Sequence, residues 1–364
     1  MHEYHESGDS VHLRDVGEFG LIARLRALTH REDARVLVGI GDDAAVVAGA
    51  NTLVMTTDAL VEGVHFRRDW SQMEGIGYRA LAASLSDLAA MGASPAYVMV
   101  TLMVPHSETV EGLEELYRGM MQLADLFAVR VVGGDVVATS GPLTISIAAT
   151  GELLGMRPLL RSGVRPGDWI FVTGDLGGSG AFVHYLASGK ACVLTPEDAL
   201  TLRLRHERPQ PQVRAARVLA TLTDDARRGT GCTGLNDISD GLASELHELA
   251  QASDVRLLIH AERVPTAPAV RHYARAAGVD PLDFALYGGE DFQLVGAVDP
   301  AQAGRLLAQM EGAGVRVTII GEAEEGDVGV DMRKGRQRVA LHKGGYDHFG
   351  QAPTDHGRTG GNGI

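Results

Sequence analysis

Residues 72–104 read QMEGIGYRALAASLSDLAAMGASPAYVMVTLMV, and they predict a helix followed directly by a buried strand. Positions 72–91 are rich in small residues with a helical pattern, and this helix is expected to end at Gly92, with Pro95 beyond it. Positions 96–104 form a continuous apolar run bounded by prolines, which is typical of a buried strand. The pair indicates an α/β arrangement in the first half of the chain.

Similar elements are predicted on both sides of this stretch. Around it we expect a helix at 17–28, strands near 36–40, 46–48 and 52–57, a helix at 108–127, and strands at 129–133 and 143–149. The turn-rich segment RSGVRPGD (161–168) is expected to be a hinge. Beyond it we predict a strand, a Gly-rich loop and a helix in WIFVTGDLGGSGA, helices near 195–205, 211–222, 242–252 and 300–311, and strands in RLLIHAERV, DFQLVGAV and VRVTIIGEA.

The order of these elements bears on the fold class. Strands and helices do not alternate strictly, which favours an α+β fold of two α/β-type domains over a doubly wound sheet. We expect a mobile leader at 1–16, an N-terminal domain at 17–152, a C-terminal domain at 153–349 and a disordered tail at 350–364.

Composition narrows the class of protein. The 364 residues carry 33 Lys and Arg against 47 Asp and Glu, a net charge of −14, which disfavours nucleic acid and anionic membranes as partners. Only two cysteines are present, Cys192 and Cys232, so a disulfide framework is excluded. No apolar run approaches the ~20 residues of a membrane span. The polar, acidic start MHEYHESGDS does not resemble a secretory signal, and a cytoplasmic location is expected.

Aspartates recur just beyond or within apolar, Gly-rich segments at five places. They are Asp42 and Asp43, Asp58, Asp87, Asp135, and Asp237 with Asp240. A single Asp of this kind usually shapes a turn or caps a helix. Five such places together suggest convergence on a hard cation, with Mg²⁺ holding a phosphate as the leading interpretation. Asp87 supports this view, because it falls in the last turn of a predicted helix, where the helix dipole disfavours a negative charge.

Known phosphate-binding motifs are missing from the sequence. It has no GxxxxGK[ST], no HRD and no DFG, so neither a P-loop nor a protein-kinase site is predicted. The loop TGDLGGSGA (173–181) could offer backbone N–H groups to a phosphate, but the signal is weak by itself, and a simple strand-to-helix turn is the favoured interpretation. Phosphoryl transfer on this chain would therefore depend on metal ions for charge neutralisation.

Four further residues have both a functional and a plain interpretation. His65 would hydrogen-bond a phosphate or be an ordinary core or surface histidine, and Arg161 would pair with a phosphate or face solvent. Glu290 follows two glycines that would let a ligand approach the backbone, or that simply form a tight turn. Tyr346 would stack on a flat ring or pack near the C-terminus.

The motifs taken together resemble the thiamine-monophosphate kinase family. Over residues 17–349 they occur in this order: GIGDDAAVV, TTDALVEGVHF, SLSDLAAMGASPA, GGD, LRSGVRPGDWIFVTGDLGGS, DISDGL, YGGEDF and KGGYDHF. Aminoimidazole ribonucleotide synthetase, selenophosphate synthetase and a hydrogenase-maturation protein share only fragments of this series. The VEGVHF and GGEDF versions distinguish the thiamine enzyme from these relatives.

The resemblance implies a reaction and an assembly. The family transfers the γ-phosphoryl group of ATP to thiamine monophosphate, which is the last step of thiamine diphosphate biosynthesis, with several Mg²⁺ ions and with K⁺ as the monovalent cation. It also implies a homodimer in which the N-terminal mixed sheets of two chains form a barrel, with a C-terminal α/β domain beside it. The N-terminal domain would bind ATP and Mg²⁺.

The resemblance also implies roles for individual residues. The metal ligands would be Asp43, Thr56, Thr57, Asp58, Asp87, Asp135, Asp237 and Asp240. Contacts to ATP would come from Tyr117, Gly134, Asp135, Arg161 and Ser239. Contacts to thiamine monophosphate would come from His65, Glu290 and Tyr346.

Two other functions stay open on the sequence. One is a related ATP-dependent enzyme that activates an amide, selenide or carbamoyl group, although the first half of the chain lacks the cysteine such chemistry favours. The other is a non-catalytic, metal-binding scaffold, for which DxDxDG calcium loops would be expected and are missing. An assay for thiamine diphosphate separates all three.

Overall fold

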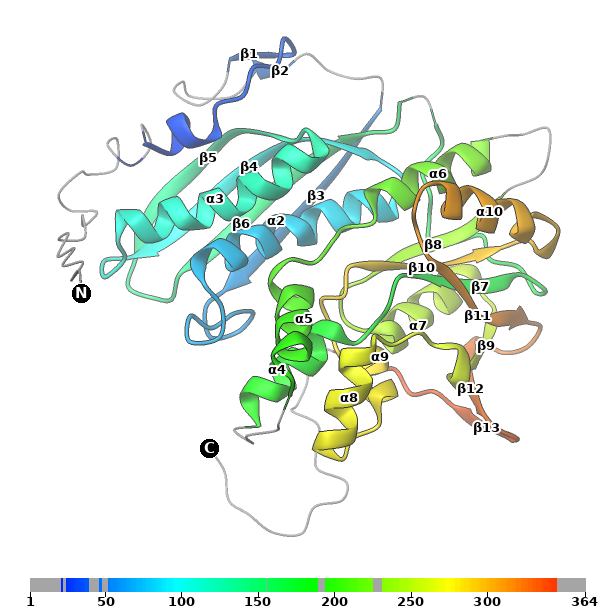
Figure 1. Cartoon of the computed structure of the whole chain (residues 1–364). Helices are drawn as coiled ribbons and strands as arrows, with labels where there is room; N and C mark the ends of the chain where they lie inside the picture. Colours follow the sequence, from blue (N-terminus) through cyan, green and yellow to red (C-terminus); the bar gives the residue numbers. More distant parts are fainter. Residues whose placement is uncertain are drawn as a thin grey trace.

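The computed structural model places two main sheets side by side, each covered by helices (Figure 1). It describes residues 21, 24–38, 46–47, 52–154, 156–188, 194–224 and 231–345. The mixed sheets and their helices confirm the predicted α+β class. Within the described residues, no helix is long and apolar enough to cross a membrane.

The first sheet has four strands in the order β3-β6-β4-β5. Strands β4 and β5 run parallel, and the other neighbours are antiparallel. Helices α2 and α3 cover one face of the sheet, in front of it in Figure 1. The bounds are β3 Leu53–Val61, α2 Met73–Ala90, β4 Ser94–Pro105, α3 Val110–Phe127, β5 Arg130–Thr139 and β6 Thr144–Glu152, and a short pair, β1 Val36–Val38 and β2 Val46–Val47, precedes them.

Glycines let α2 and α3 approach one another closely. A Cβ atom built on Gly77 would lie 1.9 Å from the carbonyl oxygen of Leu116, and one on Gly119 would lie 1.8 Å from that of Glu74. No side chain larger than hydrogen fits at either position. The two helices therefore pack backbone to backbone, which places α2 firmly over the sheet.

The other face of this sheet, here called the open face, is apolar and exposed. Because side chains alternate along a strand, alternate residues of the four strands point away from α2 and α3. Large apolar members of this set are 41–73% exposed: Leu53, Met55, Met99, Met103 and Val137. No described helix covers them.

The second sheet has seven strands in the order β13-β12-β9-β11-β7-β10-β8. Its neighbours are antiparallel except for β9 and β12, which run parallel. The strand bounds are β7 Trp169–Thr173, β8 Cys232–Ile238, β9 Arg256–His260, β10 Gln293–Val298, β11 Val317–Glu324, β12 Gly329–Lys334 and β13 Gln337–Ala340. The helix bounds are α4 Gly178–Ala187, α5 Pro196–Glu207, α6 Val213–Asp224, α7 Leu242–Ser253, α8 Pro268–Ala277, α9 Pro281–Tyr287 and α10 Pro300–Gly312, with a 3-10 turn, η1, at Ala261–Arg263.

Both faces of the second sheet are buried. Residues such as Ile170 and Val172 of β7 pack with α7 on one side, while Phe171 packs with α6 and α10 on the other. The last turn of α2 joins this second core, because Ala89 and Ala90 pack against the α6 side of it. Helix α2 thus belongs to the cores of both halves.

The predicted elements agree with the structure to different degrees. The helix at 72–91 is α2, and the strand at 96–104 is the interior of β4. The strand predicted at 129–133 is longer, because β5 continues through the glycines to Thr139 alongside β4. The sequence interpretation missed α8, α9, β12 and β13. The domain boundary at 152/153 stays a prediction, with the last strand of the first sheet ending at Glu152.

Candidate active site

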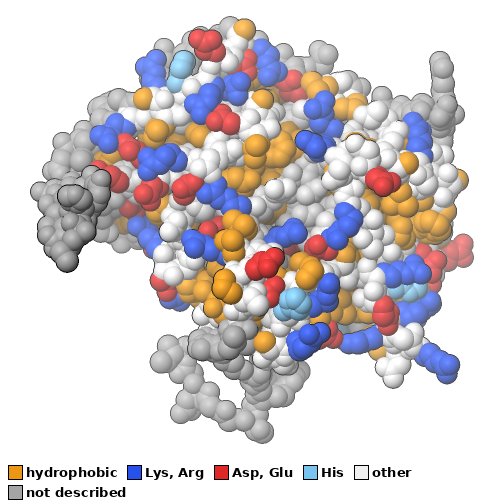
Figure 2. Space-filling view, in the orientation of Figure 1, with side chains coloured by type: hydrophobic (Ala, Val, Ile, Leu, Met, Phe, Trp, Pro, Cys, Tyr) orange, Lys and Arg blue, Asp and Glu red, His pale blue; other side chains and the backbone are white. Residues whose placement is uncertain are grey.

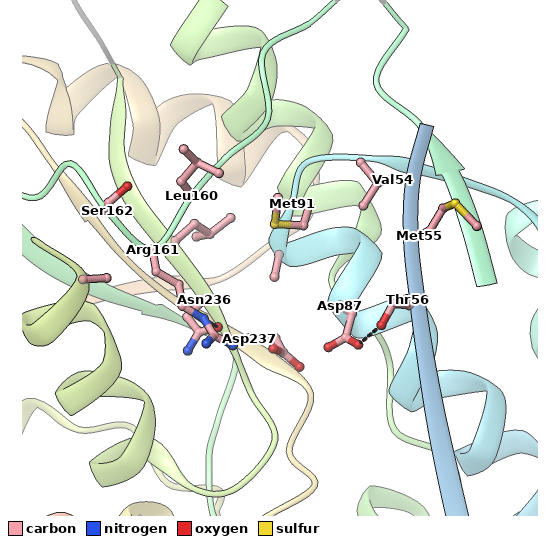
Figure 3. Close-up of a pocket in the computed structure, with 13 residues that line it drawn as sticks. Val54, Met55, Thr56, Asp87, Met91, Leu160, Arg161, Ser162, Asn236 and Asp237 are labelled. Atoms are coloured by element: carbon pink, nitrogen blue, oxygen red, sulfur yellow. Dashed lines mark hydrogen bonds between the residues drawn. The ribbon is translucent and has the colours of Figure 1, made fainter. Parts of the chain in front are cut away.

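A pocket of about 460 Å³ lies between the two sheets. Figure 3 shows Thr56 and Asp87 on one side of it, from β3 and the end of α2, and Arg161, Asn236 and Asp237 on the other. The remaining lining residues are Val54, Met55, Ala90, Met91, Leu160, Ser162, Leu235 and Ala252. Residues far apart in the sequence therefore meet at one cavity.

Three of the predicted aspartates lie close together here: Asp87 and Asp237 line the pocket, and Asp58 is near enough to influence both. Asp58 lies in β3 on the side that faces α2, Asp87 in the last turn of α2, and Asp237 near the end of β8. In Figure 3, Asp87 and Asp237 point toward one another.

Each of these carboxylates accepts a hydrogen bond from a neighbouring hydroxyl. The donor–acceptor distances are 2.7 Å from Ser84 Oγ to Asp58 Oδ2, 2.5 Å from Thr56 Oγ1 to Asp87 Oδ2, and 2.7 Å from Ser86 Oγ to Asp237 Oδ2. The hydroxyls fix the orientation of all three carboxylates. Thr56, predicted as a ligand, here positions Asp87.

Burial makes ionisation of these three groups unfavourable. Desolvation raises the pKa of Asp58. The pKa of Asp87 rises to about 6, mainly through burial and then through the charge of Asp58. The pKa of Asp237 rises to about 7 for the same reasons, with Asp87 as the repelling charge. A bound cation would relieve this repulsion.

The donor set fits a hard cation that is completed by a phosphate. Oxygen ligands are those preferred by Mg²⁺, which is usually held by one or two carboxylates plus waters and substrate phosphates. Within the part of the chain that the structure describes, no three His, Cys, Asp or Glu side chains are arranged to hold one ion by themselves. Asp43, a predicted ligand, lies outside the described residues, as does Asp42.

A polar network holds Arg161 at the far side of the pocket. Its Nε donates to Asn236 Oδ1 over 3.0 Å, and its Nη1 pairs with Glu248 over 2.9 Å. Asn236 in turn donates to Glu245 Oε2 over 2.5 Å, and the other oxygen of Glu245 accepts the backbone N–H of Asp240 over 3.2 Å. The side chain of Arg161 stays about half exposed.

Glu245 is a site residue that the sequence interpretation missed. It is 2% exposed, and burial together with the charge of Asp237 raises its pKa to about 8. Its Oε1 also lies 3.5 Å from the hydroxyl of Ser239. Glu245 therefore holds in place the loop that carries the two predicted residues Ser239 and Asp240. Its position in the first turn of α7, directly after DISDGL, was the available signal.

The structure favours the turn interpretation of the loop at 173–181. The backbone N–H groups of Gly177 and Gly178 donate to the carboxylate of Asp291, over 2.7 and 3.2 Å. Gly177 has a φ of 82°, which a glycine adopts without strain. The amides at the start of α4 are thus occupied by a side chain of the protein itself. Burial raises the pKa of Asp291 to about 7.

A second cluster brings His65 and Glu290 together through Arg79. One guanidinium nitrogen of Arg79 donates to Glu290 Oε2 over 2.6 Å, and the other donates to the backbone oxygen of His65 over 2.7 Å. The ring of His65 accepts the backbone N–H of Val61 at Nδ1 over 3.0 Å, so its proton lies on Nε2. Arg79 was missed, although a lone charge in the small-residue run YRALAAS was a visible signal.

Other predicted residues do not reach the pocket within this chain. Thr57 and Asp135 lie on the open face, on the opposite edge strands β3 and β5. Gly134 adjoins Asp135 in β5, and Tyr117 is 4% exposed in the core beneath α3, where burial raises its pKa. Tyr346 lies outside the described residues.

The surface agrees with the charge balance of the sequence. Figure 2 shows basic and acidic side chains interspersed over the visible face. No single-sign patch dominates that face.

Comparison with known proteins assigns both halves of the chain to one family. Residues 41–153 match AIR synthase related protein, N-terminal domain, and residues 165–333 match AIR synthase related protein, C-terminal domain. The thiamine-monophosphate kinase of Bacillus subtilis (strain 168) is 34% identical over 337 residues, which are 91% of this chain and 99% of that protein.

Two solved structures support the same assignment. The crystal structure of thiamine-monophosphate kinase from Stenotrophomonas maltophilia K279a has a TM-score of 0.75 at 34% identity, covering 87% of this chain and 96% of that one. AaThiL complexed with AMPPCP and TMP has a TM-score of 0.70 at 30% identity, covering 94% and 100% of the two chains. The chain belongs to the thiamine-monophosphate kinase family, within the AIR synthase related proteins.

Proposed function

We propose that the chain phosphorylates thiamine monophosphate with ATP, giving thiamine diphosphate in the last step of its biosynthesis. The observation that carries the proposal is the meeting of Asp87, Asp237 and Arg161 at one pocket, with Asp58 close enough to repel the charges of both aspartates. The relatives support it, since they are named thiamine-monophosphate kinases and AaThiL was solved with AMPPCP, an ATP analogue, and TMP.

The described residues that would hold Mg²⁺ are Asp58, Asp87 and Asp237. The family resemblance adds Asp43, Asp135, Asp240 and the two threonines of β3, Thr56 and Thr57. When bound, Mg²⁺ would neutralise phosphate charge and let two anions approach one another. The hydroxyls of Ser84, Thr56 and Ser86 keep the carboxylates oriented for that role, and Arg161 supplies the positive charge on the opposite wall.

The reaction requires little acid–base catalysis by the protein. The acceptor is a phosphate oxygen that is already ionised near neutral pH, so no strong general base is required. The main task of the protein is then to hold the donor and acceptor phosphates in line with one another. Ser239 and Arg161 are assigned to ATP by resemblance, and the Glu245 and Asn236 contacts hold both of them in place.

The open face of the first sheet is proposed as the interface of a homodimer. Its large apolar side chains, among them Met55 at 73% exposure, would be buried by the same face of a second copy. Sedimentation velocity should give a dimer mass at micromolar concentration. Met99→Glu should shift the mass to that of a monomer; a wild-type chain that sediments as a monomer would contradict the interface.

A direct assay tests the function. Purified protein with ATP, Mg²⁺ and thiamine monophosphate should yield thiamine diphosphate, and replacing K⁺ by Na⁺ should lower the rate if K⁺ is the monovalent cation. Folded protein that forms no product would overturn the proposal and favour an amide-, selenide- or carbamoyl-activating relative or a non-catalytic scaffold.

The carboxylates are tested by substitutions that remove charge and keep shape. Asp58→Asn and Asp87→Asn should each lower kcat by at least about 100-fold while the protein stays folded, because each removes a group that stabilises transferring phosphate. Asp327→Asn, in the exposed turn between β11 and β12, is the matched control and should leave kcat unchanged. Near-wild-type kcat for Asp58→Asn and Asp87→Asn would contradict the metal-dependent mechanism.

A further inference from the structure

Arg79 is an arginine buried at the junction of the two halves. It lies in α2, and only 1% of its surface is exposed. A buried guanidinium is costly unless each of its donors finds an acceptor.

The acceptors of Arg79 come from three separate segments. Its Nη2 donates to the backbone oxygen of His65, in the loop after β3. Its Nη1 donates to Glu290 Oε2 over 2.6 Å, in the loop before β10. The same nitrogen lies 2.7 Å from Nε2 of His206, at the end of α5. One side chain of the first half thus fixes two segments of the second half.

His206 extends this contact in its neutral form. Its pKa is well below the ordinary value because the ring is buried and Arg79 is beside it. A neutral ring that accepts from Arg79 at Nε2 carries its proton on Nδ1, which lies 2.8 Å from Ser179 Oγ. That hydroxyl is 3.5 Å from Glu290 Oε2. The four side chains form a closed ring of contacts.

Glu290 has an unusual backbone conformation that these contacts support. Its φ is 62°, in the left-handed region that residues other than glycine seldom occupy. Its N–H donates to the backbone oxygen of Ser239 over 2.6 Å, next to the proposed phosphate site. Among the described residues, the contacts of its carboxylate all use Oε2, which leaves Oε1 to face a ligand.

We propose that Arg79 is a positioning residue that holds Glu290 and the His65 loop for the thiamine part of the acceptor. The inference rests on the proposed function. Thiamine carries a positively charged ring and an exocyclic amine, and a carboxylate held with one oxygen outward complements both. Arg79 acts only through Glu290 and His65, because its own surface is buried. Its loss therefore affects acceptor binding and leaves ATP binding intact.

The test is a comparison of Michaelis constants. Arg79→Lys keeps the charge but cannot reach Glu290, His206 and the oxygen of His65 together. It should raise the KM for thiamine monophosphate by at least about tenfold, as expected for a lost charge-assisted hydrogen bond, and leave the KM for ATP within about twofold. Ser179→Ala, a smaller change in the same ring, should give a smaller increase in the same KM.

Arg208 provides a matched control at the same junction. It pairs with Glu74 over 2.8 Å and lies 5.0 Å above the ring of Tyr78, without contacting Glu290. Arg208→Lys should lower the melting temperature and leave both Michaelis constants unchanged. If Arg79 only stabilised the junction, Arg208→Lys and Arg79→Lys would raise the KM for thiamine monophosphate alike. That result would overturn the inference.

Calorimetric measurement of thiamine monophosphate binding, without ATP, distinguishes failure of the proposed function from failure of the positioning role of Arg79. A wild-type chain that binds and phosphorylates it, with Arg79→Lys and Ser179→Ala folded and unchanged in that KM, would overturn the inference alone. A wild-type chain that neither binds nor phosphorylates it would overturn the proposed function and this inference together. Weakened binding in Arg79→Lys with unchanged ATP binding supports the positioning role.

Discussion

Asp237 is surrounded by features that oppose its ionisation, namely burial and the charge of Asp87, and its pKa rises to about 7. In an unfolded chain an aspartate titrates near about 3.9. Between these pH values the folded protein binds more protons than the unfolded chain. The contribution of Asp237 to stability is therefore present at low pH and is lost as the pH rises toward about 7.

This pH dependence leads to a prediction about the stability of the metal-free protein. Asp237→Asn removes the ionisable group and keeps an oxygen that accepts from Ser86. In EDTA at pH 7.5 the variant should be more stable than wild type by roughly 1–3 kcal/mol, and the difference should shrink as the pH falls to 5. Thermal melts at both pH values measure it. A variant less stable than wild type at pH 7.5 would contradict the electrostatic explanation.

Mg²⁺ should act in the opposite direction. A ligand that binds only the folded state stabilises it by mass action, so 10 mM Mg²⁺ should raise the melting temperature of wild type at about pH 7.5. The increase should be smaller for Asp237→Asn, and the Asp327→Asn control should respond like wild type. Equal increases in all three proteins would show that the ion binds away from the pocket.

Site residues could be predicted from the sequence where they belong to a local motif. Asp58, Asp87 and Asp237 each stand in a recognisable motif, and the structure brings them together. Arg79 and Glu245 could not be predicted in this way. Their importance depends on partners such as Glu290, 211 positions from Arg79 along the chain, and no local spacing records such contacts.

At the scale of elements, the packing of α2 against α3 is the most restrictive feature. Gly77→Ala and Gly119→Ala should each destabilise the protein by about 3 kcal/mol or more, because the added methyl would overlap a backbone carbonyl of the facing helix. This cost exceeds the roughly 1 kcal/mol that alanine gains over glycine in a helix. Urea unfolding monitored by circular dichroism gives both values.

A glycine in an open environment supplies the control. A Cβ on Gly304, in α10, would meet no atom within 4 Å, so Gly304→Ala should stabilise the protein by about 0.5–1 kcal/mol. If Gly77→Ala were as stable as Gly304→Ala, the close approach of the two helices would be wrong.

The elements themselves were predicted unevenly, for physical reasons. Helix α2 and strand β4 are long and have strong patterns, so both were found close to their observed bounds. The pairs α8–α9 and β12–β13 are short, and their stability depends on packing against distant parts of the second half. The predicted strand ended at residue 133, whereas β5 continues because Gly134 lets the strand pass close to Val100 of β4.

At the scale of the whole molecule, the position of Asp135 bears on the assembly. It lies on edge strand β5, while Asp58 lies on the other edge strand, β3. With strands about 4.8 Å apart, these edges are roughly 14 Å from one another within one sheet. If the open faces of two copies close into the predicted barrel, β5 of one chain would adjoin β3 of the other, and the active site would be shared.

Complementation between two inactive variants tests this sharing. Asp58→Asn and Asp135→Asn should each be nearly inactive alone. Unfolded together and refolded, they should recover about a quarter of wild-type activity, because a mixed dimer contains one site with both aspartates intact. If Asp135 served its own chain, every site would keep one defect, and mixing would restore nothing.

Helix α2 has a consequence for how the protein folds and evolves. Its first turns complete the core of one half, and its last turn, at Ala89 and Ala90, completes the core of the other. Neither half can finish its interior without this segment, so scanning calorimetry should record one cooperative transition. Recombination between family members would then succeed only where the crossover point keeps α2 with both of its inherited partners, and the two halves would diversify as a single unit.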